Sequence, residues 1–408
     1  MKLNRVVITG VGAVSPLGNN VEGLMEGLEE GRSAVRFMEG WDRYSGLRSH
    51  VAAPAELKDE RLIPRQKRRF MGRMSIFSVQ AAEQALADSG IRPADIPQIK
   101  MGCAIGSTMG SAKSINDAFE IMLPNKDISQ LNSSMFFQCM SHTAAANVAQ
   151  YLELTGHIMA TSAACASSLH AVASGYDLVR LGRQEVMLCG GAEEVHPTVT
   201  GSFDVLMATS AGFNGSPSST PRPFDRDRDG LVCGEGSGVL VLEEYDRAMR
   251  RKARIYAEIT GYNTNGNGTH VSQSNKDSMV LCMRQALDDA GVAPGDIDYI
   301  NAHATATLQG DKEEAEAIAE VFGPSVPVSS LKGYMGHTLG ASGALELIAS
   351  LCMMQRGVIY PTLNLENISP ECRGINHVMA PAEKGMKMIL KNCFAFGGIN
   401  AALVCKKI

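Results

Sequence analysis

A sixteen-residue segment occurs twice in this chain, and the repeat constrains the fold more than any other feature. Residues 84–99 (QALADSGIRPADIPQI) align with residues 285–300 (QALDDAGVAPGDIDYI), with nine identical positions. Each copy carries the signals of a helix end, a glycine stop, a proline turn and a strand entry. The alternative explanation is that this order of signals is a common local pattern. We favour the repeat, which predicts two halves of similar topology.

Short runs rich in β-branched residues alternate with helical stretches along the chain. Such alternation is typical of α/β proteins whose sheets are covered by helices. We expect a helix at 77–88 and strands at 5–9, 99–105, 298–302 and 388–393. The 408 residues would divide into halves 1–250 and 251–408 near the charged run 246–254, with the functional site in a cleft between them.

The charge balance and the apolar pattern exclude several classes of protein. The chain has 38 Lys and Arg against 43 Asp and Glu, a net charge of −5, which argues against a nucleic-acid partner. The most apolar stretch, 343–360, is interrupted by Glu346 and Arg356, and the N-terminus lacks a signal-peptide pattern, so we expect no membrane segment. Ten cysteines include no C-x-x-C pair, which argues against a zinc or disulfide scaffold and fits a cytoplasmic protein.

Two patterns suggest ligand sites but match them incompletely. Gly10 and Gly12 begin a dinucleotide fingerprint, yet Ser15 occupies the position of its third glycine. Residues 225–230 (DRDRDG) open like a calcium loop, yet the twelfth position is Gly236 instead of glutamate. We therefore expect no metal, and we expect the aspartates to be buried or to cap a turn.

Cys165 is the first candidate catalytic residue. It follows the small residues TSAA (161–164) and precedes an amphipathic helix that we expect to end near Leu181. A cysteine at such a corner lies at the positive end of the helix dipole, which lowers the pKa of its thiol. Backbone N–H groups at the corner can also bind an oxyanion. Taken alone, the segment is equally compatible with a structural cysteine.

Two histidines strengthen the catalytic interpretation. His303 ends an expected strand and is followed by the hydroxyls of Thr305 and Thr307, while His337 lies in a glycine-rich loop that opens a helix. Either histidine alone is more often structural. Together with Cys165 they form a Cys-His-His set suited to acyl chemistry.

Several segments now resemble a known family, and the resemblance covers nearly the whole chain. The Cys165 corner and both histidine loops are similar to those of elongating β-ketoacyl-acyl carrier protein synthases, which are thiolase-like condensing enzymes. So are the segments VVITGVGAVSPLGN (6–19), GGAEE (190–194), PRPFDRDRDGLVCGEGSGVLVLEEY (221–245) and NCFAFGGINAAL (392–403). The resemblance implies an α/β, duplicated five-layered αβαβα fold and a dimer with an identical or a related subunit. It implies no cofactor beyond the phosphopantetheine that arrives on acyl carrier protein.

The resemblance also assigns a role to each site residue. Cys165 matches the nucleophile that takes the growing acyl chain as a thioester, and His303 and His337 match the pair that binds the malonyl thioester carbonyl and assists decarboxylation. The other matches are a pair that orients the histidines (Lys332 and Glu346), a gating phenylalanine whose N–H joins the oxyanion hole (Phe396), and hydroxyls that hold the phosphopantetheine arm (Thr305 and Thr307). The implied reaction is a decarboxylative Claisen condensation in fatty acid or specialised polyketide or polyene elongation.

The sequence departs from the family pattern at a few positions. Ala304 and Ala395 replace glycines, Ile399 replaces a threonine at the gate, and Ala163 stands where threonine is frequent. Because alanine restricts the backbone more than glycine does, gating and chain-length preference stay open. These changes spare the catalytic side chains and favour a specialised synthase.

Two alternative functions remain open. Thiolases share the Gly336–His337 loop, but they use a second, acid/base cysteine, for which Cys393 is the candidate, and they do not decarboxylate. A chain-length-factor-like partner subunit is the other alternative, and the presence of Cys165, His303 and His337 argues against it because such subunits typically lack the nucleophile.

A basic run predicts where acyl carrier protein docks. Residues 61–73 contain six Lys and Arg and no carboxylate, and a second basic cluster lies within 247–254. Because the carrier of this family is acidic, complementary charge would raise its association rate. We expect Arg65, Lys67 and Arg68 to form this docking face; a solvated basic surface is the alternative.

Overall fold

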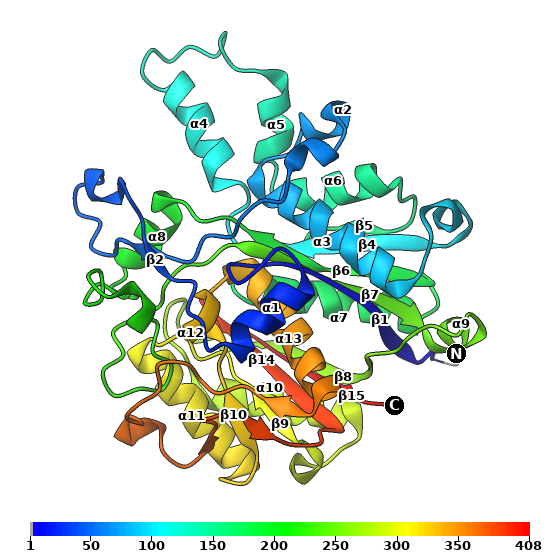
Figure 1. The fold of residues 1–408 in the computed structure, drawn as a ribbon, viewed down its shortest axis with the longest axis vertical. Helices are drawn as coiled ribbons and strands as arrows, with labels where there is room; N and C mark the ends of the chain where they lie inside the picture. Colours follow the sequence, from blue (N-terminus) through cyan, green and yellow to red (C-terminus); the bar gives the residue numbers. More distant parts are fainter. Residues whose placement is uncertain (1–2) are drawn as a thin grey trace.

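The computed structural model describes residues 3–408, and in it eleven strands form one hydrogen-bonded sheet (Figure 1). Their order is β5–β4–β6–β7–β1–β8–β15–β14–β9–β10–β12. The N-terminal half contributes β1 (Val6–Val14), β4 (Met101–Gly106), β5 (Ile158–Met159), β6 (Val186–Glu193) and β7 (Gly236–Glu244). The C-terminal half contributes β8 (Ala257–Gly266), β9 (Tyr299–Asn301), β10 (Pro327–Ser329), β12 (Asn376–His377), β14 (Met388–Ala395) and β15 (Ile399–Lys406).

The two sets of strands repeat one topology. β4 runs parallel to β5 and β6, whereas β7 is antiparallel to β6 and β1. In the second set, β9 runs parallel to β10 and β14, whereas β15 is antiparallel to β14 and β8. Strand pairing joins the two sets at β1 and β8, where Val6–Ile8 pairs with Ala257–Ile259. The strand order and directions therefore match the duplication that the sequence repeat predicts.

The repeated sequence segments adopt the same local structure. In the first copy, α3 (Arg73–Ser89) ends at Gly90 with a φ of 72°, and a 3-10 turn begun by a proline leads into β4. In the second copy, α10 (Lys276–Ala290) ends at Gly291 with a φ of 66°, and a similar turn leads towards β9. Both glycines are left-handed, a conformation that glycine adopts without a steric penalty. The predicted helix and strands are confirmed, with ends that shift by a few residues.

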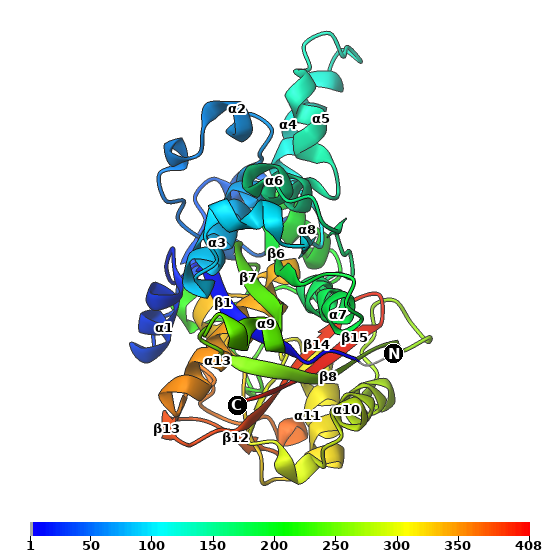
Figure 2. The same ribbon diagram turned by 90° about the vertical axis from the view of Figure 1, so that its right-hand side faces the viewer.

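Helices form three layers around the two sets of strands. One outer layer, α3 with α6 (Thr143–Leu152), covers the N-terminal strands, and the other, α10 with α11 (Leu308–Phe322), covers the C-terminal strands. The middle layer consists of α7 (Ser167–Arg180) and α13 (Ser342–Arg356), each of which contacts strands of both halves. Figure 2 shows α7 between the two sets of strands. The layer order is thus α-β-α-β-α.

Several shorter helices and strand pairs complete the fold. They are α1 (Val21–Glu29), α2 (Arg65–Arg68), α8 (Pro197–Asp204), α9 (Tyr245–Arg250), α12 (Lys332–Met335), and the strand pairs β2 (Arg36–Phe37) with β3 (Val51–Ala52) and β11 (Val358–Ile359) with β13 (Ala382–Glu383). An arm formed by α4 (Ala112–Met122) and α5 (Ser133–Cys139) projects from the body (Figures 1 and 2). Across residues 3–408, no helix combines the length and the apolar character needed to cross a membrane.

Both incomplete ligand patterns have structural explanations. Gly10 and Gly12 lie inside β1, where an added Cβ would come within 2.2 Å of the Ala85 oxygen and 2.0 Å of the Ala81 oxygen, so the glycines let α3 pack closely. Asp225 is fully buried and accepts hydrogen bonds from the backbone N–H groups of residues 227, 366 and 367. The expectation of a buried, capping aspartate turn is confirmed. Nine of the ten cysteines are buried and all are free.

Candidate active site

Cys165 lies at a tight corner immediately before α7. Ala164 precedes it with a φ of 47°, in the left-handed region that costs a non-glycine residue about 1 kcal/mol or more. The hydroxyl of Ser167 secures the corner: it accepts from the Ala163 N–H at 2.9 Å and lies 2.6 Å from the Ala164 oxygen, to which it donates. The predicted sharp turn into a helix is confirmed, and the helix ends at Arg180, one residue before the expected Leu181.

The expected lowering of the Cys165 thiol pKa is wrong. The side chain is 3% exposed, and burial raises the pKa of its thiol to about 12 because a thiolate loses its hydration there. Lys332 acts in the opposite direction, but its attraction is the smaller effect. The thiol is therefore neutral at pH 7, and a neighbouring base must take its proton.

His303 follows β9, and a buried carboxylate fixes its backbone. The two oxygens of Glu314, on α11, accept the N–H groups of His303 at 2.8 Å and of Ala304 at 2.6 Å. Glu314 is 1% exposed, so these bonds are shielded from water. Three residues further on, Ala306 has a φ of 70°, and its N–H donates to Asp311 at 3.0 Å. The helix α11 thus holds the His303 loop through two acidic side chains.

His337 lies between α12 and α13, and its backbone is clamped to the strand-like segment before β7. Its N–H donates to the Val232 oxygen at 2.7 Å, and its carbonyl accepts the Gly234 N–H at 2.8 Å. Gly336 makes this approach possible, because it has a φ of 64° and an added Cβ would lie 3.0 Å from the Val232 oxygen. The clamp uses only backbone groups, so the imidazole stays free for chemistry.

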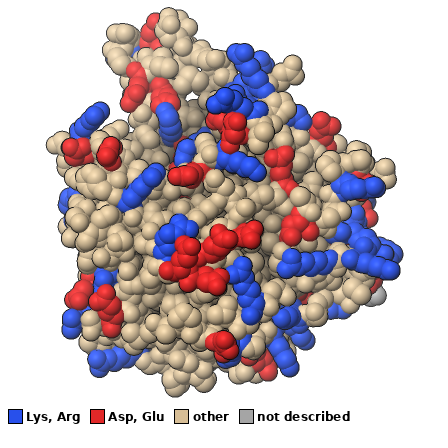
Figure 3. Space-filling view, in the orientation of Figure 1, with Lys and Arg blue, Asp and Glu red and all other residues tan. Residues whose placement is uncertain are grey.

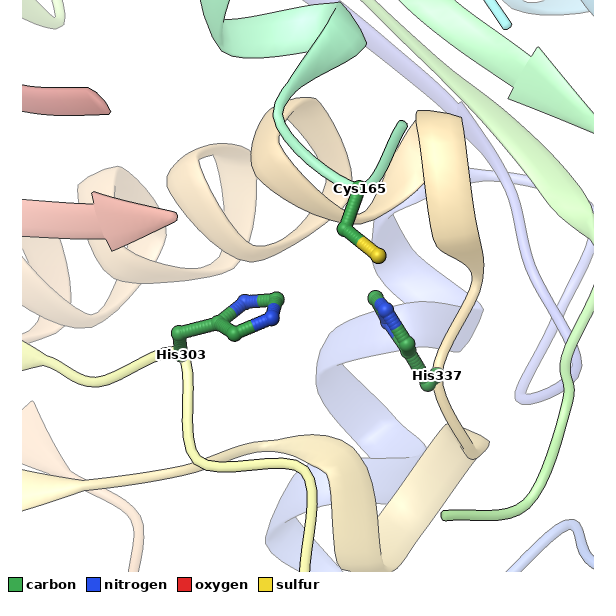
Figure 4. Close-up of side chains that lie close together, drawn as sticks. All are labelled: Cys165, His303 and His337. Atoms are coloured by element: carbon green, nitrogen blue, oxygen red, sulfur yellow. The ribbon is translucent and has the colours of Figure 1, made fainter. Parts of the chain in front are cut away.

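The three side chains converge at one point (Figure 4). The Cys165 sulfur and one nitrogen of each imidazole all lie within 4.8 Å of one another, and the ring centroids of His303 and His337 are 5.2 Å apart. Among residues 3–408, neither nitrogen of His337 nor Nδ1 of His303 has a hydrogen-bond partner. Such a set of donor atoms could also hold a metal ion, so the absence of a metal stays a prediction.

Both histidines are uncharged at neutral pH. Burial lowers the pKa of each imidazole well below its ordinary value, because a charged ring would lose its hydration. The ammonium groups of Lys332 and Lys391 lower both values further. A neutral imidazole carries one N–H donor and one acceptor nitrogen, so each ring can donate to an oxygen or accept a proton.

Lys332 and Glu346 form a buried ion pair behind the histidines. Nζ of Lys332 lies 2.7 Å from Oε1 of Glu346, and both side chains are fully buried. Neither side chain hydrogen-bonds a histidine in the described part of the chain, and Lys332 acts on both rings through its charge. Lys391, on β14, occupies the other oxygen of Glu346.

A cavity leads from the surface to these groups. The inner cavity is narrow, with a volume of about 40 Å³, and is lined by Cys165, His303 and His337. It shares Thr307 and Phe396 with a larger outer cavity. The Thr305 and Thr307 hydroxyls are 3.1 Å apart. The structure thus places the expected gate and the expected arm-binding hydroxyls along one entry route.

The structure separates the basic run 61–73 into paired and unpaired side chains. Lys67 lies 3.3 Å from Glu153, Arg68 lies 3.8 Å from Glu60, and Arg73 binds the buried Glu235 at 2.6 Å. Arg65 and Arg69 are exposed, and no carboxylate lies within 4.0 Å of them in the described chain. Figure 3 shows Lys and Arg gathered over α2. In the second basic cluster, Arg247 and Arg251 bind the buried Glu243, which gives them a structural role.

The departures from the family pattern cause little local strain. Ala304 and Ala395 do not have a positive φ, so alanine fits the backbone at both positions. Cys393 is fully buried on β14; it lies close enough to Cys165 to raise the pKa of that thiol, but it is not among the residues that line the inner cavity.

Sequence reasoning missed Glu314 and Lys391. A signal existed for each: Asp311 and Glu314 are three residues apart on the face of α11 that also buries Ala315 and Ile318, and Lys391 interrupts the apolar strand MILKNCFA. A charged residue at a position expected to be buried indicates a paired, functional or capping group.

Comparison with known proteins agrees with this geometry. The family models "Beta-ketoacyl synthase, N-terminal domain" and "Beta-ketoacyl synthase, C-terminal domain" match residues 3–248 and 256–366. The chain is 35% identical over 408 residues to 3-oxoacyl-[acyl-carrier-protein] synthase 1 of Escherichia coli (strain K12), covering 100% of both chains.

Solved structures of the same family have the same fold. The crystal structure of a beta-ketoacyl synthase from Burkholderia phymatum STM815 superposes with a TM-score of 0.95 at 43% identity, covering 99% of this chain and 100% of that one. A type II PKS acyl-carrier protein in complex with its ketosynthase bound to the hexaketide gives a TM-score of 0.91 at 30% identity, covering 100% of both chains. The expected thiolase-like fold and the acyltransferase class are confirmed: the chain belongs to the beta-ketoacyl synthase family.

Proposed function

We propose that this synthase condenses an acyl chain, held as a thioester on Cys165, with malonyl-acyl carrier protein. The observation that carries the proposal is the convergence of the Cys165 sulfur and two neutral imidazoles within 4.8 Å. The acyl chain belongs to fatty acid or to specialised polyketide or polyene elongation, and the similar proteins include 3-oxoacyl-[acyl-carrier-protein] synthases and polyketide synthases. We also propose a cytoplasmic location.

Acyl transfer requires a base because the thiol is neutral. The acceptor nitrogen of a neutral imidazole takes the proton from the Cys165 sulfur, and the thiolate attacks the carbonyl of the incoming thioester. The N–H groups of Cys165 and Phe396 would stabilise the resulting oxyanion, helped by the positive end of α7. Collapse then breaks the old C–S bond, and the carrier thiol leaves with the proton.

Decarboxylation uses the histidine pair as hydrogen-bond donors. The malonyl thioester oxygen would accept an N–H from His303 and another from His337, and loss of CO₂ leaves its charge on that oxygen as an enolate. The enolate carbon attacks the acyl carbonyl on Cys165, which forms the new C–C bond. Collapse of this second oxyanion expels the Cys165 sulfur and releases the β-ketoacyl thioester. The Cys165 thiolate then takes one proton from solvent, which restores the neutral thiol.

The entry route has the chemistry that a phosphopantetheine arm needs. Thr305 and Thr307 present two hydroxyls along the path to the histidines, and such hydroxyls can bond the amides of the arm. Phe396 lies where the inner and outer cavities meet, in contact distance of Phe203, with ring centroids 5.9 Å apart. We propose that it gates this passage. No other cofactor is needed for the reaction.

We propose that acyl carrier protein docks over α2, on the predicted Arg65, Lys67 and Arg68 and on Arg69; of these, Arg65 and Arg69 have no carboxylate within 4.0 Å in the described chain. Charge complementarity mainly raises the association rate and is screened by salt. The kcat/KM for carrier-bound substrate should therefore fall steeply with ionic strength, whereas a pantetheine thioester should respond little. Arg65→Glu should raise KM for the carrier alone, and Arg183→Glu, an exposed charge reversal beyond α7, is the matched control. Equal salt sensitivity of both substrates would refute the docking face.

We propose that the projecting arm packs against a second subunit, identical or related. Phe119, Leu123, Ile128 and Phe136 on the arm are 49%, 59%, 68% and 68% exposed, a cluster that a soluble monomer rarely leaves uncovered. Light scattering should give the mass of two chains, and Phe136→Glu should lower it. A monomeric wild-type chain would require a different, related subunit.

Mass spectrometry of the intact protein tests the function directly. After incubation with an acyl-carrier thioester, Cys165 should carry one acyl group, and Cys165→Ala should carry none. Cys393→Ala, a buried cysteine outside the cavity lining, should still be acylated. An unmodified Cys165 would favour the chain-length-factor-like partner, and acylation without CO₂ release from malonyl carrier would favour a thiolase-type enzyme.

A further inference from the structure

One carboxylate behind the histidines is held by two lysines. One carboxylate oxygen of Glu346, on α13, accepts a hydrogen bond from the ammonium of Lys332 at 2.7 Å. The other oxygen accepts one from the ammonium of Lys391. All three side chains are fully buried. Only the first pair corresponds to a role that the family resemblance implies, so the second lysine needs its own explanation.

A second buried carboxylate lies close to the same group. Both oxygens of Glu314 accept hydrogen bonds from backbone N–H groups, and Oε1 also accepts from Asn392 at 3.3 Å. Burial raises the pKa of Glu314, whereas the two backbone N–H donors, Lys391 and Lys332 favour its ionised form, the carboxylate to which these donors bond. The four side chains Lys332, Lys391, Glu346 and Glu314 then carry two positive and two negative charges. Lys391 supplies the second positive charge, which makes the four together neutral.

We propose that Lys391 is a positioning residue for decarboxylation: it fixes Glu346 from β14 and offsets the second buried carboxylate, so that His303 and His337 remain uncharged N–H donors towards the enolate. The inference rests on the proposed function. Without Lys391, two carboxylates would face one ammonium, which favours an extra proton on an imidazole and opposes a new negative charge.

The groups around the histidine pair agree with this assignment. Burial, Lys332 and Lys391 all lower the pKa of both imidazoles. For Lys391 itself, burial lowers the pKa of the ammonium, but Glu346, Cys393 and Glu314 outweigh it and the net change is upwards. Lys332 on α12 and Lys391 on β14 act on both rings, Glu314 on α11 binds the His303 N–H, and Cys165 before α7 lies within 4.8 Å of both rings. Further titratable groups surround these: Glu193 on β6 and Cys233 before β7 act on Cys165, Cys393 on β14 acts on Cys165 and Lys391, and Glu346 on α13 acts on Lys391.

A purely structural role for Lys391 is the competing explanation, and the pH profile separates the two. Lys391→Met keeps the length of the side chain and removes its charge, and Lys391→Gln keeps a donor for Glu346. Ile389→Met is the matched control, because Ile389 lies two residues earlier on the same face of β14 and is 1% exposed. A structural defect would lower the decarboxylation rate equally at every pH.

The experiment measures CO₂ release from malonyl-acyl carrier protein between pH 5 and pH 8. In Lys391→Met and Lys391→Gln, the midpoint of the acid limb should lie about one pH unit or more above that of the wild type. Ile389→Met should keep the wild-type profile. Unchanged profiles in both Lys391 variants, whatever their absolute rates, would overturn the proposal.

An NMR titration of ¹³C-labelled histidine measures the charge of the His303 and His337 imidazoles in the absence of turnover. Signals assigned with His303→Ala and His337→Ala should titrate at higher pH in Lys391→Met than in the wild type. This result distinguishes the two proposals: a wild-type protein that releases no CO₂ would refute the proposed function, whereas imidazoles that titrate identically with and without Lys391 would refute its role.

Discussion

Replacing Glu314 with alanine should damage both stability and decarboxylation, and the structure gives the size of each effect. The carboxylate accepts the N–H groups of His303 and Ala304 at 2.8 and 2.6 Å, in surroundings that leave Glu314 1% exposed. Each buried donor left without an acceptor costs about 1–3 kcal/mol, so the free energy of unfolding should fall by about 2–6 kcal/mol. Urea titration followed by circular dichroism measures this loss.

The same substitution should release the loop that carries His303. A displacement of about 1 Å in a catalytic group can cost about 10²-fold in rate, so CO₂ release should fall by about that factor, while acylation of Cys165 falls less. Glu316→Ala is the matched control: Glu316 is on the same helix, is half-buried, and lies 4.0 Å from Lys312, so its loss should change stability by less than about 0.5 kcal/mol. If Glu314→Ala were as stable and as active as this control, the assigned role of the carboxylate would be refuted.

Three further predictions concern the reacting side chains. Cys165→Ala should abolish condensation but leave CO₂ release from malonyl carrier measurable, because the histidines stabilise the enolate; complete loss of both in the coupled assay would contradict this division. His303→Ala and His337→Ala should each slow decarboxylation by about 10²- to 10³-fold, as expected for the loss of one donor to an oxyanion, and single-turnover acylation of Cys165 should fall less. In the wild type, CO₂ release should stay constant from pH 8 down to about pH 6.5 and fall only in more acidic solution, because burial and the nearby lysines keep the pKa of both imidazoles well below 6.5. An acid limb above pH 7 in the rate profile would show that a histidine is charged in the resting enzyme.

The sequence repeat predicted the duplicated topology because its signals are local. A glycine with a positive φ and a proline turn are dictated by backbone sterics, so Gly90 and Gly291 mark equivalent helix ends in both halves. The pairing of β1 with β8 could not be predicted in the same way. It involves only three residues on each strand, and it depends on how the two sets of strands meet in space.

The site shows the same division between local and tertiary effects. The corner at Cys165 and the loops of both histidines follow from small residues and glycines next to expected strands. The charge state of Cys165 does not, because burial opposes the helix dipole and is set by residues distant in sequence. Likewise, Lys67 and Arg68 have acidic neighbours in space, Glu153 and Glu60, that the basic run itself does not contain.

The middle layer of helices limits how this protein can move. Because α7 and α13 come from different halves and each packs against strands of both, a hinge between the halves would have to break the largest apolar core. The two halves therefore cannot open as rigid bodies, and substrate must enter through a local rearrangement. The turn after β14 is suited to that task, since Phe396 is followed by Gly397 and Gly398 with φ of 89° and 70°, a stretch of backbone that can change conformation while the frame stays still.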